Sequence, residues 1–98
     1  MPEKTILLVE DNADERSIYA TVLRHHGYRV LETWNGEDAI RIARQSHPDL
    51  VVLDIRLPSI SGLTVSQVLR SSRVTSGIPI LAISAAAPDP DVLEEVGC

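Results

Sequence analysis

Acidic and hydroxyl side chains follow three short apolar runs, at positions where they could bind a metal ion or react. These are Glu10 and Asp11 after residues 5–9, Asp54 after residues 50–53, and Ser84 after residues 78–83. Carboxylates gathered in one place repel each other, and a bound Mg²⁺, which prefers oxygen ligands, offsets that repulsion. An aspartate beside such a metal can attack a phosphoryl group, while a nearby hydroxyl binds one of its oxygens. The residue types therefore suit an aspartyl-phosphate site.

The three apolar runs are the elements that must position this site. Unbroken runs rich in Val, Ile and Leu are typical of strands buried on both faces of a parallel sheet. The segment 28–31 is shorter and partly alternating, and it predicts an outer strand. Because the carboxyl ends of parallel strands meet at one edge of a sheet, the polar residues should converge in one cleft there.

Amphipathic segments separate the predicted strands. Asn12 or Asp11 can cap a first helix with an apolar stripe, which ends at Gly27. A second helix opens near Glu37 and stops at His47-Pro48, and a third begins at Gly62 or a nearby serine. A last short helix follows, with its N-cap at Asp89. The predicted fold class is α/β, a doubly wound parallel sheet with helices on both faces. Trp34 is expected to be a packing residue.

Composition narrows the function classes. The chain has 98 residues, a net charge of −5 and no basic cluster, which argues against nucleic-acid binding by this segment. No apolar run approaches the length that spans a membrane, and the acidic start does not resemble a signal peptide. Cys98 is the sole cysteine, so no disulfide framework is expected. These features predict a single cytoplasmic domain, residues 1–98, without membrane contact.

Three motifs together resemble the receiver domain of two-component response regulators. They are ILLVEDN at residues 6–12, LVVLDIRLP at 50–58 with Gly62 downstream, and IPILAISA at 78–85. The resemblance implies a flavodoxin-like sheet of strand order 2-1-3-4, here without the family's fifth strand and helix. It also implies that Pro58 and Gly62 shape the loop behind Asp54.

The resemblance assigns a role to each site residue. Asp54 corresponds to the phosphoacceptor and also to a metal ligand, and Asp11 to a direct Mg²⁺ ligand. Glu10 corresponds to its partner, which often acts through water, and the backbone carbonyl of Arg56 to a further ligand. Ser84 occupies the position of the switch hydroxyl. The implied protein is a bacterial phosphoacceptor that assists its own phosphorylation, and not a turnover enzyme. Its partner is a sensor histidine kinase or a phosphotransfer protein.

The sequence departs from the family pattern at its C-terminal end. Receivers place a lysine before a fifth strand, whereas Lys4, the only lysine here, precedes the first strand. We therefore expect a receiver that is incomplete at its C-terminus. Without a fifth strand, the segment 80–83 would be a bare apolar edge that could pair with a second copy. An alternative is a degenerate receiver that acts only in protein interaction or dimerisation.

Two other protein classes fit the sequence less well. Phosphatases resembling haloacid dehalogenases need a second aspartate two residues after the nucleophile, where this chain has Arg56. A nucleotide-binding α/β module would need a glycine-rich turn after the first strand. The sequence there is EDNADE, which is acidic and lacks glycine.

Overall fold

The fold is an alternation of strands and helices. A computed structural model describes residues 3–57 and 60–83. The elements in chain order are β1 (Thr5–Val9), α1 (Ala13–His25), β2 (Arg29–Thr33), α2 (Gly36–Ser46), β3 (Leu50–Asp54), α3 (Gly62–Ser71) and β4 (Ile80–Ile83). The predicted alternation is thereby confirmed as far as β4. The expected roles of Pro58, Ser84 and the helix capped by Asp89 lie outside the described residues.

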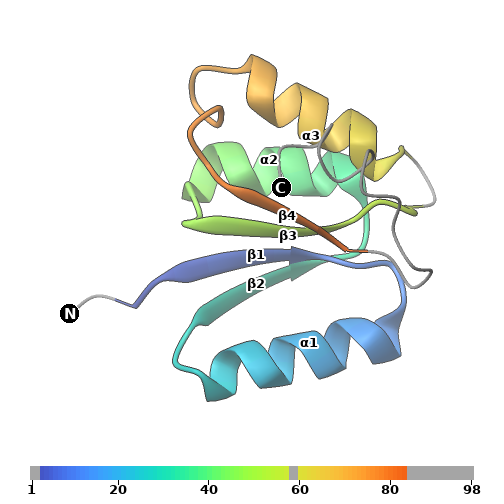
Figure 1. The fold of residues 1–98 in the computed structure, drawn as a ribbon, viewed down its shortest axis with the longest axis vertical. Coiled ribbons are helices and arrows are strands. Elements are labelled where there is room, and N and C mark those ends of the chain that lie inside the picture. The colour runs from blue at the N-terminus through green and yellow to red at the C-terminus, as the bar shows by residue number, and fades with distance from the viewer. Residues whose placement is uncertain (1–2, 58–59, 84–98) are drawn as a thin grey trace.

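The strands form one parallel sheet in the order β2-β1-β3-β4, which confirms the predicted fold class and strand order. Helix α1 lies on one face of the sheet, and α2 and α3 lie on the other (Figure 1). In the register between β1 and its neighbours, Val9 pairs with both Thr33 and Leu53. The strand ends are therefore level, and the residues that follow them lie at one edge of the sheet.

Polar side chains cap the described helices at their N-termini. Asn12 Oδ1 accepts the Glu15 amide at 2.9 Å at the start of α1, and Asn35 likewise caps α2. At α3 the cap is Ser61, the serine next to Gly62. Of the two predicted caps for α1, Asn12 takes the role, so Asp11 is not needed to begin the helix.

The core is aliphatic on both faces of the sheet. Between the sheet and α2 with α3 lie Leu7, Val9, Ala39, Ala43, Val51, Leu53, Val65, Leu69 and Ile80. Between the sheet and α1 lie Ile6, Leu8, Ala20, Val30 and Val52. The central strands β1 and β3 contribute to both clusters, which is why their sequences are apolar at successive positions.

Most of the apolar stripe of α1 does not face the sheet. Ile18, Val22 and Tyr19 are 63%, 50% and 40% exposed, whereas Ala20 is buried and Leu23 packs against the smaller core cluster. Helical periodicity groups side chains on one face, but the packing of the helix decides which face is covered. The stripe is present, and the structure places most of it toward the solvent.

The fourth strand lies at an edge of the sheet, because within the described residues it pairs with β3 alone. Leu81 on this strand is 48% exposed. None of the helices in the described ranges has the length and apolar character needed to cross a membrane.

Candidate functional site

Three carboxylates meet at the edge of the sheet where β1 and β3 end. Glu10 and Asp11 follow β1, and Asp54 is the last residue of β3. One oxygen of each of these side chains lies within 4.8 Å of the others. The structure thus brings together the three carboxylates that the sequence singled out, because β1 and β3 are direct neighbours.

These carboxylates adjoin a pocket of about 310 Å³. Its lining residues are Asp11, Asn12, Glu15, Asp54 and Arg56. Glu15 did not stand out in the sequence, although it lies four residues after Asp11 and so follows it by about one helical turn. Arg56 lines this pocket and therefore lies beside the carboxylate cluster. The metal-binding role of its backbone carbonyl stays a prediction.

Glu10 is the most buried member of the cluster. Only 2% of the Glu10 surface is exposed, and its Oε2 has no hydrogen-bond partner among the described residues. Burial, together with the adjacent Asp54 and Glu15, raises the pKa of Glu10 from its ordinary 4.5 to about 9, and burial is the largest of these causes. A buried carboxyl oxygen without a partner is costly, and a divalent cation would both satisfy it and favour its charged form.

Hydrogen bonds hold the backbone of Glu10 and the carboxylate of Asp54. The Glu10 amide donates to the Thr33 carbonyl at 3.0 Å, and the Glu10 carbonyl accepts from Arg16 Nη1 at 3.0 Å. Asp54 Oδ1 accepts the Arg56 amide at 2.9 Å. This hydrogen bond restricts the rotation of the Asp54 carboxyl group at the end of its strand.

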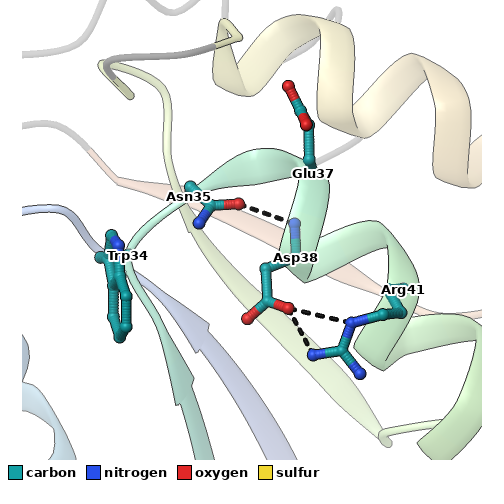
Figure 2. A pocket seen from close by; sticks show the side chains of 5 residues that line it. All are labelled: Trp34, Asn35, Glu37, Asp38 and Arg41. Carbon is teal, nitrogen blue, oxygen red and sulfur yellow. Dashed lines mark hydrogen bonds and ion pairs between the residues drawn. The ribbon is translucent and has the colours of Figure 1, made fainter.

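A second hollow, of about 510 Å³, lies beside the start of α2 and is shown in Figure 2. Asp38 and Arg41 form an ion pair there, and the Thr33 hydroxyl also donates to Asp38 at 2.9 Å. These contacts lower the pKa of Asp38, Arg41 being the larger influence and Thr33 the next. Because Asp38 is already paired with a cation, this hollow is a weaker candidate for metal binding than the carboxylate cluster.

Trp34 lies at the edge of this hollow and is 60% exposed. Trp34 was expected to be a packing residue, and the structure shows that it is not part of the core. Its ring lies against the guanidinium group of Arg16, with the Arg16 Cζ atom 5.7 Å from the ring centroid. A cation above an aromatic face explains how a large ring can remain in place at the surface.

Sequence comparison identifies one family. The family model of the response regulator receiver domain matches residues 6–97. A polar-differentiation response regulator DivK from Brucella ovis is 34% identical over 97 residues, which cover 97% of this chain and 79% of the relative.

Solved structures agree with this result. A putative response regulator from Chloroflexus aurantiacus superposes with a TM-score of 0.92 at 29% identity, covering 99% of this chain and 81% of the other. The receiver domain of a sensor histidine kinase from Pseudomonas aeruginosa has a TM-score of 0.85 and 33% identity, and the match covers 92% of this chain and 74% of the other. That domain was solved with a magnesium ion coordinated in its active-site cleft. The family match over nearly the whole sequence, with the shared fold, shows that this chain belongs to the response regulator receiver domains.

Proposed function

We propose that Asp54 accepts the phosphoryl group in this receiver domain, which belongs to a family of phosphoacceptor modules in two-component signalling. The observation that carries the proposal is the placement of Asp54. It is buried at the end of β3, bonded to the Arg56 amide, and within 4.8 Å of the Glu10 and Asp11 carboxylates. An aspartate fixed beside a prospective metal site has the position that a nucleophile toward phosphorus needs.

The same cluster fits Mg²⁺. Glu10, Asp11 and Asp54 offer oxygen ligands. The buried Oε2 of Glu10, which has no hydrogen-bond partner in the part of the chain that the structure describes, favours a cation at this place. The carbonyl of Arg56 would add a further ligand. The metal would neutralise negative charge on the transferred group and on the crowded carboxylates. The magnesium ion in the Pseudomonas aeruginosa receiver domain supports this assignment.

The transfer that we propose begins at a phosphohistidine of a sensor histidine kinase or a phosphotransfer protein. A carboxylate oxygen of Asp54 attacks the phosphorus atom, the phosphorus–nitrogen bond breaks, and the histidine side chain leaves and recovers its neutral imidazole by taking up a proton. The product is an acyl phosphate on Asp54, with Ser84 as the hydroxyl that binds one phosphoryl oxygen. The chain then acts as a regulatory phosphoacceptor in the cytoplasm, and not as a turnover enzyme.

Self-association through the edge of β4 is a second part of the proposal. It is supported by the position of β4 at the edge of the described sheet and by Leu81, which is 48% exposed on it. An apolar edge strand offers unpaired backbone groups to another chain.

Incubation with Mg²⁺ and a small phosphodonor such as acetyl phosphate, followed by intact-protein mass spectrometry, tests the assignment of Asp54. We expect the wild type to gain one phosphoryl group and Asp54→Asn to gain none. Asp11→Asn should mainly weaken Mg²⁺ binding, so that phosphorylation of this variant needs a higher Mg²⁺ concentration. Asp49→Asn is the matched control, because Asp49 lies just before β3, at the opposite end of that strand from Asp54.

Two results would contradict the proposal. Equal phosphorylation of Asp54→Asn and the wild type would assign the phosphoryl group to another residue. Absence of modification in the folded wild type would favour a receiver that acts only in protein interaction or dimerisation.

A further inference from the structure

Arg16 on α1 connects the carboxylate cluster with the second strand. Its side chain is only 20% exposed. Its Nη1 donates to the Glu10 carbonyl at 3.0 Å, and its Nε lies 3.6 Å from Glu32 Oε1 on β2. The guanidinium group lies over the ring of Trp34, with its Cζ atom 5.7 Å from the ring centroid. Contacts to a carbonyl, a carboxylate and an aromatic ring together fix the position of this group.

The bond to the Glu10 carbonyl matters because that carbonyl belongs to the peptide group between Glu10 and Asp11. The preceding amide, that of Glu10, is already held by the Thr33 carbonyl. With Arg16 in place, the backbone of Glu10 is held from both sides where it leaves β1. The direction in which the chain presents the Asp11 carboxylate follows from the orientation of this peptide group.

We propose that Arg16 is a positioning residue of the metal site: its hydrogen bond to the Glu10 carbonyl orients the Glu10–Asp11 pair for cation binding, with Glu32 and Trp34 holding the guanidinium group in place. This inference rests on the proposed metal site. It concerns an arginine outside the carboxylate cluster, which acts on the cation through the backbone.

The charge of Arg16 and its hydrogen bond to the Glu10 carbonyl have opposite effects on cation affinity. A positive charge beside a cation site lowers cation affinity, whereas a well-oriented ligand pair raises it. The ion pair with Glu32 offsets part of that charge. Substitution can therefore separate the two effects, because loss of orientation weakens Mg²⁺ binding and loss of charge alone strengthens it.

Trp34 provides a signal for this arrangement. It is the sole tryptophan in the sequence, and it lies at the connection between β2 and α2, as Figure 2 shows. Because its ring lies beside the guanidinium group of Arg16, which bonds to the Glu10 carbonyl, a cation bound at the Glu10–Asp11 pair changes the electric field at the ring. The fluorescence of the wild type should therefore change during a Mg²⁺ titration.

The experiment measures Mg²⁺ affinity by calorimetry and Trp34 emission in the same titrations. Arg16→Gln removes the charge and the bond, and Arg16→Lys keeps the charge but not the planar group. We expect both to weaken Mg²⁺ binding roughly tenfold and to reduce the emission change. Arg24→Gln is the matched control: Arg24 also lies on α1 and pairs with Glu32, at 2.9 Å, but bonds to the Val30 carbonyl rather than to that of Glu10. It should retain the affinity and the emission change of the wild type.

The outcomes that overturn the inference are distinct from failure of the proposed function. Unchanged or tighter Mg²⁺ binding by Arg16→Gln would show that the hydrogen bond from Arg16 gives no net gain in cation affinity, and would overturn the inference. If that variant does not fold, unchanged affinity in Arg16→Lys overturns the inference equally. Lack of Mg²⁺ binding by the wild type would instead refute the metal site itself.

Discussion

Gly62 lies so close behind Asp54 that a Cβ atom added to it would be 2.5 Å from the Asp54 carbonyl oxygen. The same atom would be 2.4 Å from the Cα of Ile55. The Gly62 amide also donates to the Ile55 carbonyl at 3.1 Å. Here the start of α3 packs backbone against backbone on the segment that leaves β3, so the absence of a side chain at Gly62 is a requirement of the site.

Gly62→Ala should therefore disturb the end of β3 directly. The atoms in the way belong to the backbone and cannot rotate aside, so we expect a loss of about 1–3 kcal/mol in the free energy of unfolding. Mg²⁺ affinity should fall as well, since Asp54 moves with its backbone. Gly77→Ala is the control, because an added Cβ there meets no atom within 4 Å. Equal stability of the two variants in urea unfolding would contradict this account of Gly62.

Asp54→Asn should stabilise the metal-free protein and abolish its response to Mg²⁺. The substitution removes one charge from a group of carboxylates whose oxygens lie within 4.8 Å of each other. We expect a gain on the order of 1 kcal/mol without metal. In the wild type, Mg²⁺ at a hundred times its dissociation constant should add about 2.7 kcal/mol. Urea unfolding with and without Mg²⁺ measures both effects, and a Mg²⁺-stabilised Asp54→Asn variant would contradict the prediction.

The paired carboxylate of Asp38 should make stability depend on pH. Arg41 and the Thr33 hydroxyl lower the folded-state pKa of Asp38 below its ordinary value of 3.8. The resulting stabilisation is present above that ordinary value and is lost as the pH falls through the lowered folded-state pKa. Asp38→Asn should therefore cost about 1 kcal/mol at pH 7, and the cost should shrink in acid.

Urea unfolding of Asp38→Asn and the wild type across this acid range measures the difference. Arg41→Gln should show a similar loss at neutral pH, and the two losses should not add in the double variant, because both remove the same contact. A difference between Asp38→Asn and the wild type that stays constant with pH would refute the assignment.

Leu81→Lys should reduce self-association if β4 is the contact between copies. A lysine on an edge strand opposes pairing with a second chain, and Leu81 is exposed enough to be replaced at little cost. Light scattering over a range of concentrations measures the change. Ile18→Lys introduces the same charge on the exposed stripe of α1 and is the control. A wild type that remains monomeric at high concentration, or an effect confined to Ile18→Lys, would exclude the β4 edge.

The local pattern of the sequence was enough to predict most of the fold. Apolar runs of four to six residues, each followed by polar groups, predicted β1, β3 and β4, and the amphipathic segments between them predicted the helices. These properties depend on neighbours along the chain, so they can be recognised without tertiary contacts. The strand order came from the resemblance to receiver domains, since pairing between distant strands has no local signal.

The tertiary structure decided the orientation of α1 and the contacts of Arg16. The apolar stripe of α1 was clear, yet Ile18 and Val22 face the solvent while Ala20 packs on the sheet. Likewise, sequence spacing gave no reason to connect Arg16 with the Glu10 carbonyl. A repeating pattern states which side chains share a face of an element, but not which partner covers it.

For the site, the sequence by itself determined which acids follow β1 and β3, because each is fixed by the end of its own strand. Only the tertiary structure decided that Glu10 is buried with an oxygen that lacks a partner within residues 3–57 and 60–83, and that Glu15 and Arg56 line the pocket beside Asp11 and Asp54. The physical reason is that burial and hydrogen bonding depend on segments far apart in the chain, which come together only when the helices pack on the sheet.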